Sequence, residues 1–276
     1  MADQDFTVRF WGTRGSIPCA SPDYMQYGGH TSCLEVMCGD FQLILDGGTG
    51  IRMLADVLMQ GAPKPLTILL SHTHFDHVMG LPFFMPLYTK GWDIRFFAGH
   101  LAPEDTLKNV FQKMMVSPFF PISPDAFKAS LSYTDFTPGT VLNLHPGVVV
   151  RTLALPHPDR ATGYRIEFGG KAFCYITDIE HKAGTLNQDL VAFLRGADAV
   201  AYDCTFTDAE YKAHVGWGHS TWEEGLRLVH AAGAKKLVIF HHNPNRDDAG
   251  MAGVEAAAKA ADAATIVSRD GMLLTV

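Results

Sequence analysis

The stretch His72-Thr73-His74-Phe75-Asp76-His77 places four potential metal ligands within six residues. A largely apolar run, residues 66–70, precedes it and is typical of a buried strand. The first two histidines are two positions apart, so they project to the same side of an extended chain, whereas the aspartate and the last histidine come after the chain has begun to turn. Imidazoles and a carboxylate suit zinc and similar divalent ions. The stretch therefore predicts a metal site at the end of a strand, although a histidine-rich polar loop is the alternative.

Working outward from this motif, short strands and amphipathic helices alternate along the chain. The pattern of apolar residues predicts strands at 7–11, 33–38, 41–45, 66–70, 148–155, 164–168, 172–176, 199–202 and 235–240, with short segments at 265–268 and 272–276 closing the chain. It predicts helices after Asp46-Gly47-Gly48-Thr49-Gly50 and at 104–115, 221–232 and 251–263. This order favours two sheets packed on each other with helices outside, an α/β (α+β) fold.

We expect residues 1–276 to form a single domain. The segment at about 81–133 is rich in Phe, Met and Pro, and we interpret it as a lid-like insertion that covers the site. Phe119 and Phe120 in this segment could stack on a base or a sugar of a substrate. An ordinary apolar covering of the sandwich edge is the alternative.

Composition limits the function classes. Hydrophobic residues make up 47% and charged residues 18% of the chain, which predicts a sizeable core and excludes long-range disorder. The formal net charge is −7, so an extended nucleic-acid surface is not expected. It does not exclude a small phosphate ester, because a metal pair supplies local positive charge.

We expect a cytoplasmic protein, because the sequence shows no recognisable targeting segment. The N-terminal stretch Met1-Ala2-Asp3-Gln4-Asp5 is acidic and lacks an apolar run, so it is not expected to be a signal peptide. No apolar run is long enough for a membrane span, so we expect no membrane contact. The five cysteines are scattered and none forms a Cys-x-x-Cys pair, which favours reduced thiols and argues against a cysteine-based zinc site.

The His-x-His-x-Asp-His motif after an apolar strand resembles the signature of the metallo-β-lactamase superfamily. Four further residues resemble that family's remaining motifs, in the same order along the chain: Asp46 before Gly47-Gly48, His157 between two prolines, Asp178 after a strand and His241 after another. The resemblance covers almost the whole chain, and the Phe-rich segment is the least matched part. It implies an αββα sandwich of the metallo-β-lactamase type.

The resemblance also implies a ligand set for two divalent metal ions. The first ion would be held by His72, His74 and His157, and the second by Asp76, His77 and His241. Asp178 would bridge both ions, and Asp46 would orient a ligand imidazole from behind. Zinc is the preferred metal, with manganese and iron as alternatives, because His and Asp ligands suit all three.

Several of these positions also have ordinary explanations. His157 could be a simple loop residue, and Asp46 and Asp178 could be turn formers. His241 and His242 point to opposite faces if the strand persists, so either could be the ligand. The family pattern favours His241.

Three loops resemble the phosphodiesterase branch of the family, which contains the tRNA 3′-end endonucleases (tRNase Z) and the cyclic phosphodiesterase of phosphonate breakdown. These loops are Gly12-Thr13-Arg14-Gly15-Ser16, Gly28-Gly29-His30-Thr31-Ser32 and Gly218-His219-Ser220-Thr221. Arg14 and His30 could face the site or be ordinary surface residues. His219 matches the histidine of the branch's His-Ser-Thr loop, and Asp203 matches the position of its motif glutamate.

The residues themselves support a role for His219. It precedes a predicted helix N-terminus, where backbone N–H groups favour phosphate oxygens and an imidazole could donate a proton to a leaving alkoxide. Asp203 could orient it, and we count Asp76 with these two as a candidate catalytic residue. The alternative is that His219 only belongs to a helix-capping sequence.

The spacing of two motifs argues for a small substrate. Only twenty residues separate His157 from Asp178, where the tRNA endonucleases insert their tRNA-binding arm. We therefore expect a hydrolase that acts on a small or cyclic phosphodiester through a hydroxide bridging the metals. Hydrolysis of an ester, lactone or thioester by the same metals is the alternative, followed by a non-catalytic metal-binding sensor. The oligomeric state stays open, with a homodimer suggested by the resemblance alone.

Overall fold

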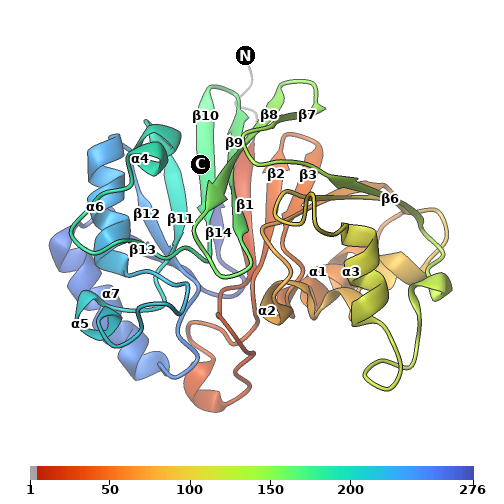
Figure 1. Ribbon diagram of the computed structural model, residues 1–276, viewed down its shortest axis with the longest axis horizontal. Coiled ribbons are helices and arrows are strands. Elements are labelled where there is room, and N and C mark those ends of the chain that lie inside the picture. The colour runs from red at the N-terminus through yellow and green to blue at the C-terminus, as the bar shows by residue number, and fades with distance from the viewer. Residues whose placement is uncertain (1–4) are drawn as a thin grey trace.

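The computed structural model describes residues 5–276, so the acidic N-terminal stretch falls almost wholly outside the described residues. Two mixed sheets face each other in the middle of the molecule (Figure 1). The first sheet has the order β14-β1-β2-β3-β4-β5-β6, with bounds Leu273–Thr275, Phe6–Gly12, Cys33–Cys38, Phe41–Leu45, Pro65–Leu70, Asp93–Ala98 and Ser130–Asp135. The second has the order β13-β12-β11-β10-β9-β8-β7, with bounds Ile266–Val267, Leu237–Phe240, Ala199–Asp203, Lys171–Ile176, Ala161–Phe168, Val148–Leu155 and Val141–His145.

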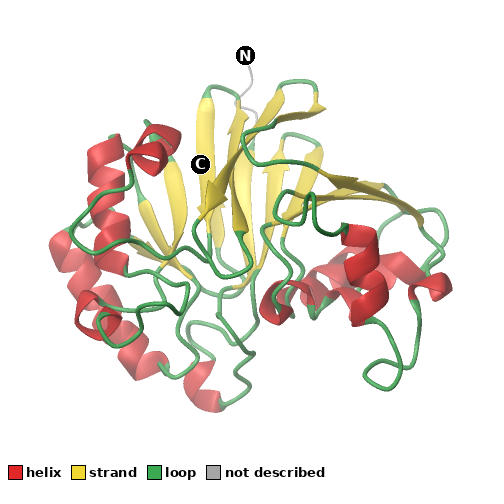
Figure 2. Cartoon of the chain, viewed as in Figure 1, coloured by secondary structure: helices red, strands yellow, loops and turns green. Residues whose placement is uncertain are grey.

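Helices cover the two outer faces (Figure 2). On one side lie α1 (Gly50–Leu58), α2 (Phe75–Val78) and α3 (Leu107–Met114). On the other lie α4 (Gln188–Leu194), α5 (Asp208–Tyr211), α6 (Trp222–Ala232) and α7 (Asp248–Ala261). Three apolar clusters fill the spaces, one between the sheets and one under each helical layer. The predicted α/β sandwich is thus confirmed.

The direction of the strands determines where side chains can gather. Strands β3 to β6 run parallel in the first sheet, and β10 to β13 run parallel in the second. The carboxyl ends of parallel strands lie at the same edge of a sheet, so the loops that follow them meet there. Every strand that leads into a predicted site residue, apart from the antiparallel β8, belongs to one of these parallel sets.

The two sheets are tied together close to that edge. The hydroxyl of Tyr164, on β9, is fully buried and donates a hydrogen bond of 2.6 Å to the carbonyl of Leu70, the last residue of β4. This bond crosses the core just before the metal-ligand motif begins. It therefore fixes the second sheet relative to the residues that carry the chemistry.

Much of the Phe-rich segment at 81–133 is part of the sandwich itself. It supplies β5 and the start of β6 to the first sheet, and Phe84, Phe96 and Phe111 are buried in the core. A lid-like role for the rest of the segment stays a prediction. The loop after α3 still exposes Phe119, with 88% of its surface accessible, so substrate stacking there stays a prediction.

Three strands, β5, β6 and β7, were not predicted, and two helices begin elsewhere than expected. Helix α3 begins at Leu107 because Thr106 caps it, accepting a hydrogen bond from the backbone of Asn109. Helix α7 begins at Asp248, because Asp247 accepts a hydrogen bond from Gly250. Both caps are short polar side chains that end the preceding loop.

The bond between Tyr164 and Leu70 gives a stability prediction. Tyr164→Phe removes the donor and leaves a buried carbonyl short of a partner, so the free energy of unfolding should fall by about 1–2 kcal/mol. Urea unfolding followed by circular dichroism measures it. Tyr133→Phe, on the edge strand β6, is the matched control and should change stability by less than about 0.5 kcal/mol. Equal stability of the two variants would contradict the assigned role of the bond.

Candidate metal centre

The predicted site residues gather where six strands end. Each strand leads directly or within two residues into one of them: β3 into Asp46, β4 into His72, β8 into His157, β10 into Asp178, β11 into Asp203 at its own last position and β12 into His241. The short helix α2 adds Asp76 and His77, with His74 at its N-cap. The first sheet and α2 thus carry one half of the cluster, and the second sheet carries the other half.

Three of these residues turn the chain sharply as their strand ends. Asp46, Asp178 and His241 have φ angles of 61°, 54° and 59°, the left-handed region that non-glycine residues rarely adopt. Each costs about 1–2 kcal/mol relative to ordinary backbone. The surrounding structure therefore holds the side chains in place against local strain, as functional sites often do.

The first group of donors consists of His72, His74, His157 and Asp178, whose ligand atoms all lie within 4.8 Å of one another. The Nε2 atom of His157 lies 3.0 Å from Nδ1 of His74. The Oδ2 atom of Asp178 lies 3.6 Å from Nε2 of His72 and 3.7 Å from Nε2 of His157. These are the four residues that the resemblance assigned to the first metal.

The second group consists of Asp76, His77, Asp178 and His241. Here Asp178 presents its other oxygen, Oδ1, at 3.1 Å from Nε2 of His77 and 3.2 Å from Nε2 of His241. The Oδ2 atom of Asp76 lies 3.1 Å from the same His241 nitrogen. One carboxylate therefore faces both groups with one oxygen each, which is the geometry a bridging ligand requires.

The donors fit divalent cations. The Nε2 atoms of His72 and His77 are buried without a hydrogen-bond partner, and an unpaired buried nitrogen is costly unless something binds it. Burial, with the neighbouring imidazoles, lowers the pKa of His72 well below its usual value, so this ring is a neutral donor. Two carboxylates and five imidazoles without a sulfur ligand suit zinc, manganese or iron.

The charge balance points the same way. Burial alone would raise the pKa of Asp178, but the imidazoles of His241, His77 and His72 outweigh it and hold this pKa well below its usual range. Burial alone would lower the pKa of His77. The carboxylates of Asp76 and Asp178 outweigh burial and raise this pKa well above its usual value. The ionised carboxylates that favour a proton on His77 would equally favour a metal cation there.

Groups behind the ligands fix which ring nitrogen faces inward. Asp46 accepts hydrogen bonds from His77 Nδ1 (2.8 Å), from the backbone N–H and hydroxyl of Ser71 (both 2.7 Å) and from the hydroxyl of Tyr175 (2.7 Å). Since a carboxylate only accepts, His77 must carry its proton on Nδ1 and present Nε2 as the lone-pair donor. Asp46 thus lies where the sequence predicted, behind a candidate ligand.

Two other histidines are held in the same way. His157 Nδ1 donates to the carbonyl of Gly218 at 2.7 Å. His241 Nδ1 lies 2.9 Å from the hydroxyl of Thr205, which itself donates to Asp203 at 2.8 Å. Sequence reasoning missed Gly218, although it lies inside a quoted loop, and Thr205, which lies two residues after Asp203. Nothing in the sequence pointed to Tyr175.

The neighbouring histidines at the end of β12 lie on opposite sides. His241 faces the donor groups, whereas His242 Nε2 donates to the carbonyl of Ser268 at 2.9 Å. The two side chains diverge because His241 has a positive φ immediately after the strand. Of the two alternatives, only His241 lies within reach of the candidate ligands.

Arg14 does not face the site. It is fully buried and donates hydrogen bonds to the carbonyls of Gly28, Asn243 and Arg246 at 2.8–3.1 Å. It therefore joins the loops before β2 and after β12. His30 lies near Thr49, with its Nδ1 at 3.4 Å from the threonine hydroxyl.

His219 completes the cluster. Its Nδ1 lies 3.0 Å from Oδ2 of Asp203 and 3.8 Å from Oδ2 of Asp178, and its ring stacks on His241 with centroids 5.0 Å apart. Burial lowers its pKa, but Asp203 and the other carboxylates outweigh burial and raise the pKa to about 9. The ring is therefore protonated near neutral pH, with Nδ1 engaged by Asp203.

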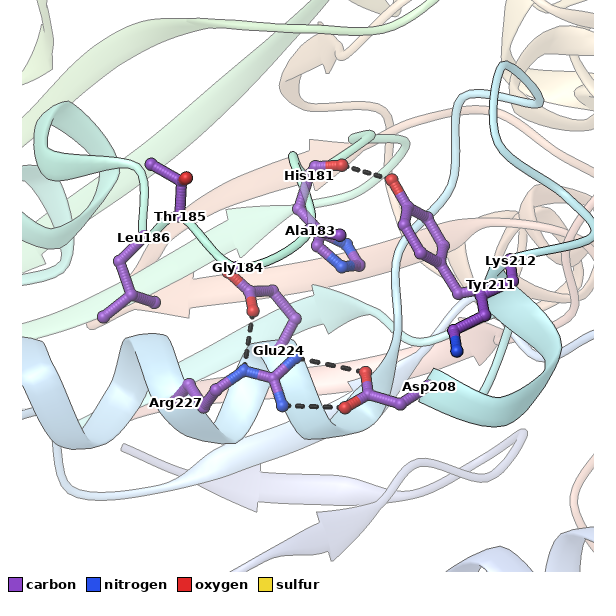
Figure 3. Close-up of a pocket in the computed structure, with 10 residues that line it drawn as sticks. All are labelled: His181, Ala183, Gly184, Thr185, Leu186, Asp208, Tyr211, Lys212, Glu224 and Arg227. Atoms are coloured by element: carbon purple, nitrogen blue, oxygen red, sulfur yellow. Dashed lines mark hydrogen bonds and ion pairs between the residues drawn. The ribbon is translucent and has the colours of Figure 1, made fainter.

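A pocket of about 370 Å³ opens over the donors and is lined by Ser16, Thr73, His74, Phe75, Asp76, Asp178 and His219. A larger cavity, of about 460 Å³, includes none of the candidate ligands (Figure 3). There Arg227 pairs with Asp208 and Glu224, and the hydroxyl of Tyr211 donates to the backbone of His181, so these polar groups satisfy one another. Of these two pockets, only the smaller one is lined by candidate metal ligands.

Comparison with known proteins places the chain in a family. A family model described as the beta-lactamase superfamily domain matches residues 43–242. Ribonuclease BN from Citrobacter koseri is 26% identical over 83% of this chain and 87% of its own length. Among solved structures, the metallo-beta-lactamase fold protein YhfI from Bacillus subtilis has a TM-score of 0.75 at 19% identity, covering 99% of this chain and 100% of that one. A diphosphatase from the PhnP family has a TM-score of 0.71 at 20% identity, covering 98% of each chain.

The chain therefore belongs to the beta-lactamase superfamily. The predicted family and the sandwich fold are both confirmed, and the family supports the predicted class of a metal-dependent hydrolase. Within residues 5–276, no helix combines the length and apolar character needed to cross a membrane.

The contrast between His241 and His242 gives a metal-content prediction. His241→Ala should lower the metal bound per chain from about two to about one, because it removes a donor from the second group only. His242→Ala should keep about two metals and lose stability instead, since it removes a buried hydrogen bond to Ser268. Elemental analysis after dialysis, together with thermal unfolding, measures both. Equal metal loss in the two variants would contradict the assignment.

Chelation should destabilise the fold. A ligand that binds only the native state stabilises it by about 4 kcal/mol at a thousand times its Kd, and the buried carboxylates would otherwise repel one another. Excess EDTA should therefore lower the Tm, and added zinc or manganese should restore it. Coincident Tm values for metal-loaded and chelated protein, verified by elemental analysis, would argue against these donors as a metal centre.

Proposed function

We propose that this chain is a phosphodiesterase that acts on a small or cyclic phosphodiester. The observation that carries the proposal is the place of His219, whose imidazole is held by Asp203 beside two donor groups on the rim of the pocket. Hydrolysis of a phosphodiester requires an acid for the leaving alkoxide, and His219 lies where such an acid is needed.

Two divalent ions, when bound, supply a nucleophile at neutral pH and neutralise charge on the phosphate oxygens. His72, His74 and His157 would hold the first ion, Asp76, His77 and His241 the second, and Asp178 both. Zinc is the preferred metal of the proposal, with manganese and iron as alternatives.

His219 is proposed as the general acid. Asp203 accepts a hydrogen bond from the Nδ1–H of His219. The Nε2–H is then the proton that His219 can give to the leaving oxygen. Asp203 also accepts hydrogen bonds from the hydroxyl and backbone N–H of Thr205, so its place is fixed from two directions. Asp76 is oriented by the backbone N–H of Ser16 at 2.7 Å.

The size and charge of the site support a small substrate. The chain between His157 and Asp178 is taken up by the hairpin of β9 and β10, which turns at Gly169 and Gly170. That segment adds no arm, and the net charge of −7 disfavours a long polyanion. Phe75, with 72% of its surface exposed, forms an apolar wall of the pocket.

The names of the relatives support chemistry at phosphorus. A ribonuclease BN and a PhnP-family diphosphatase both take their names from the cleavage of phosphate bonds. A cytoplasmic location is part of the proposal, and it is supported by the five free cysteines, four of which are buried.

The activity test uses bis(p-nitrophenyl) phosphate. Metal-loaded wild type should hydrolyse it, because p-nitrophenolate leaves without an acid. On an alkyl phosphodiester such as a 2′,3′-cyclic nucleotide, whose leaving alkoxide needs a proton, His219→Ala should lower kcat by about 10²- to 10⁴-fold with unchanged metal content. His145→Ala is the control, because His145 is a partly buried histidine at the end of β7 that stacks on Phe41 and belongs to none of the donor groups, and this variant should keep full activity.

The competing reaction is tested in the same assay. Turnover of p-nitrophenyl acetate but not of the phosphodiester, by protein verified to hold its metals, would replace the proposal with an ester or lactone hydrolase. His219 would then be dispensable for chemistry.

A further inference from the structure

We propose that Glu180 is a positioning residue that sets the place of His219 and the orientation of His157 at the same time. The inference rests on the proposed function, because it concerns residues assigned to that site. Glu180 comes two positions after Asp178 and belongs to none of the motifs that suggested the metal centre.

The carboxylate of Glu180 holds the loop that precedes His219. Its Oε1 accepts the backbone N–H of Gly216 at 2.8 Å, and its Oε2 accepts that of Gly218 at 2.7 Å. The intervening Trp217 has 62% of its surface exposed and meets Phe206 and His214 edge-on. The two charge-assisted hydrogen bonds restrain the backbone on both sides of it.

The same loop supports a candidate metal ligand. Gly218 has a φ of 82°, and a Cβ at this position would lie 2.5 Å from Nδ1 of His157 and 2.4 Å from Pro158. Only glycine allows so close an approach, and it brings the Gly218 carbonyl to 2.7 Å from His157 Nδ1. The loop held by Glu180 thus fixes the proton of His157 on Nδ1 and directs Nε2 toward the donor group.

The backbone of Glu180 makes the connection rigid. Its N–H donates to the carbonyl of Pro156 at 2.8 Å, one residue before His157. Glu180 is therefore bonded to the strand end that carries His157 and to the loop that carries His219, and it lies two residues after Asp178. Three segments that are distant in sequence meet at this one residue.

A carboxylate is the side chain that this position requires. Two oxygens accept from two diverging N–H groups at once, whereas an amide has one acceptor oxygen and an NH₂ group that can only donate. Glu180→Gln therefore keeps the shape and removes one of the two bonds. Glu180→Ala removes both.

The test compares Glu180→Gln and Glu180→Ala with wild type in the metal-loaded state. We expect kcat on an alkyl phosphodiester such as a 2′,3′-cyclic nucleotide, whose leaving alkoxide needs the acid, to fall about 10-fold for the Gln variant and up to about 100-fold for the Ala variant, with KM changed less than about threefold. Glu167→Gln is the matched control. It is a partly buried glutamate on β9 that pairs with Arg151 and Arg165, and it should behave as wild type.

Two further measurements are independent of turnover. Competition with a chelator should show metal affinity at one of the two sites weakened by about 10-fold in Glu180→Gln. In zinc-loaded protein with ¹⁵N-labelled histidine, the Nδ1–H signal of His157 should shift or broaden in the same variant. A purely structural role would lower Tm and leave both measurements unchanged.

The outcomes separate this inference from the proposed function. Folded Glu180 variants with wild-type kcat, metal affinity and His157 signal would overturn the positioning role while an active wild type upholds the phosphodiesterase. An inactive wild type would overturn the phosphodiesterase, and a weakened metal affinity with a shifted His157 signal would still support the positioning role.

Discussion

The carboxylate of Asp178 imposes the constraint on which the rest of the structure depends. It is enclosed at the junction of the two sheets, with one oxygen toward His72 and His157 and the other toward His77 and His241. A buried carboxylate is costly unless positive charge surrounds it. The strands of both sheets must therefore end at the same edge of the sandwich, so that donors from both sheets reach this one carboxylate. The parallel pairing of β3 with β4 and of β10 to β12 brings their carboxyl ends to that edge.

The centre works only if the two halves of the sandwich stay in register, because neither half holds a complete set of donors. The bond from Tyr164 to Leu70 and the bond from Tyr175 to Asp46 both cross between the sheets close to the centre. Behind the donors, Asp46, Gly218 and Thr205 each fix the proton of one histidine. Contacts between the sheets thus hold the donors at the right distance, and contacts behind the donors orient their rings.

Much of this was accessible from the sequence. The His-x-His-x-Asp-His stretch carries local information, since strand, turn and donors are adjacent, and the motif residues appear together as expected. Strand β6 was missed because it is an edge strand with a half-polar pattern, and β5 because its phenylalanines resemble a lid as much as a core. The choice between His241 and His242 depended on one φ angle, and the contacts of Tyr175 and Glu180 depend on tertiary structure that no local pattern encodes.

The left-handed backbone at Asp46, Asp178 and His241 has a consequence for how this chain can evolve. Glycine at any of the three would relax the local conformation, and at Asp178 it would also remove a buried charge. In a copy that no longer binds metal, the backbone strain at these positions and the buried charge of Asp178 would no longer be offset by metal binding. Where lineages of this fold retain all three side chains, continuous selection for activity is the force that keeps them, and a decayed copy should lose these turns before it loses its sheets.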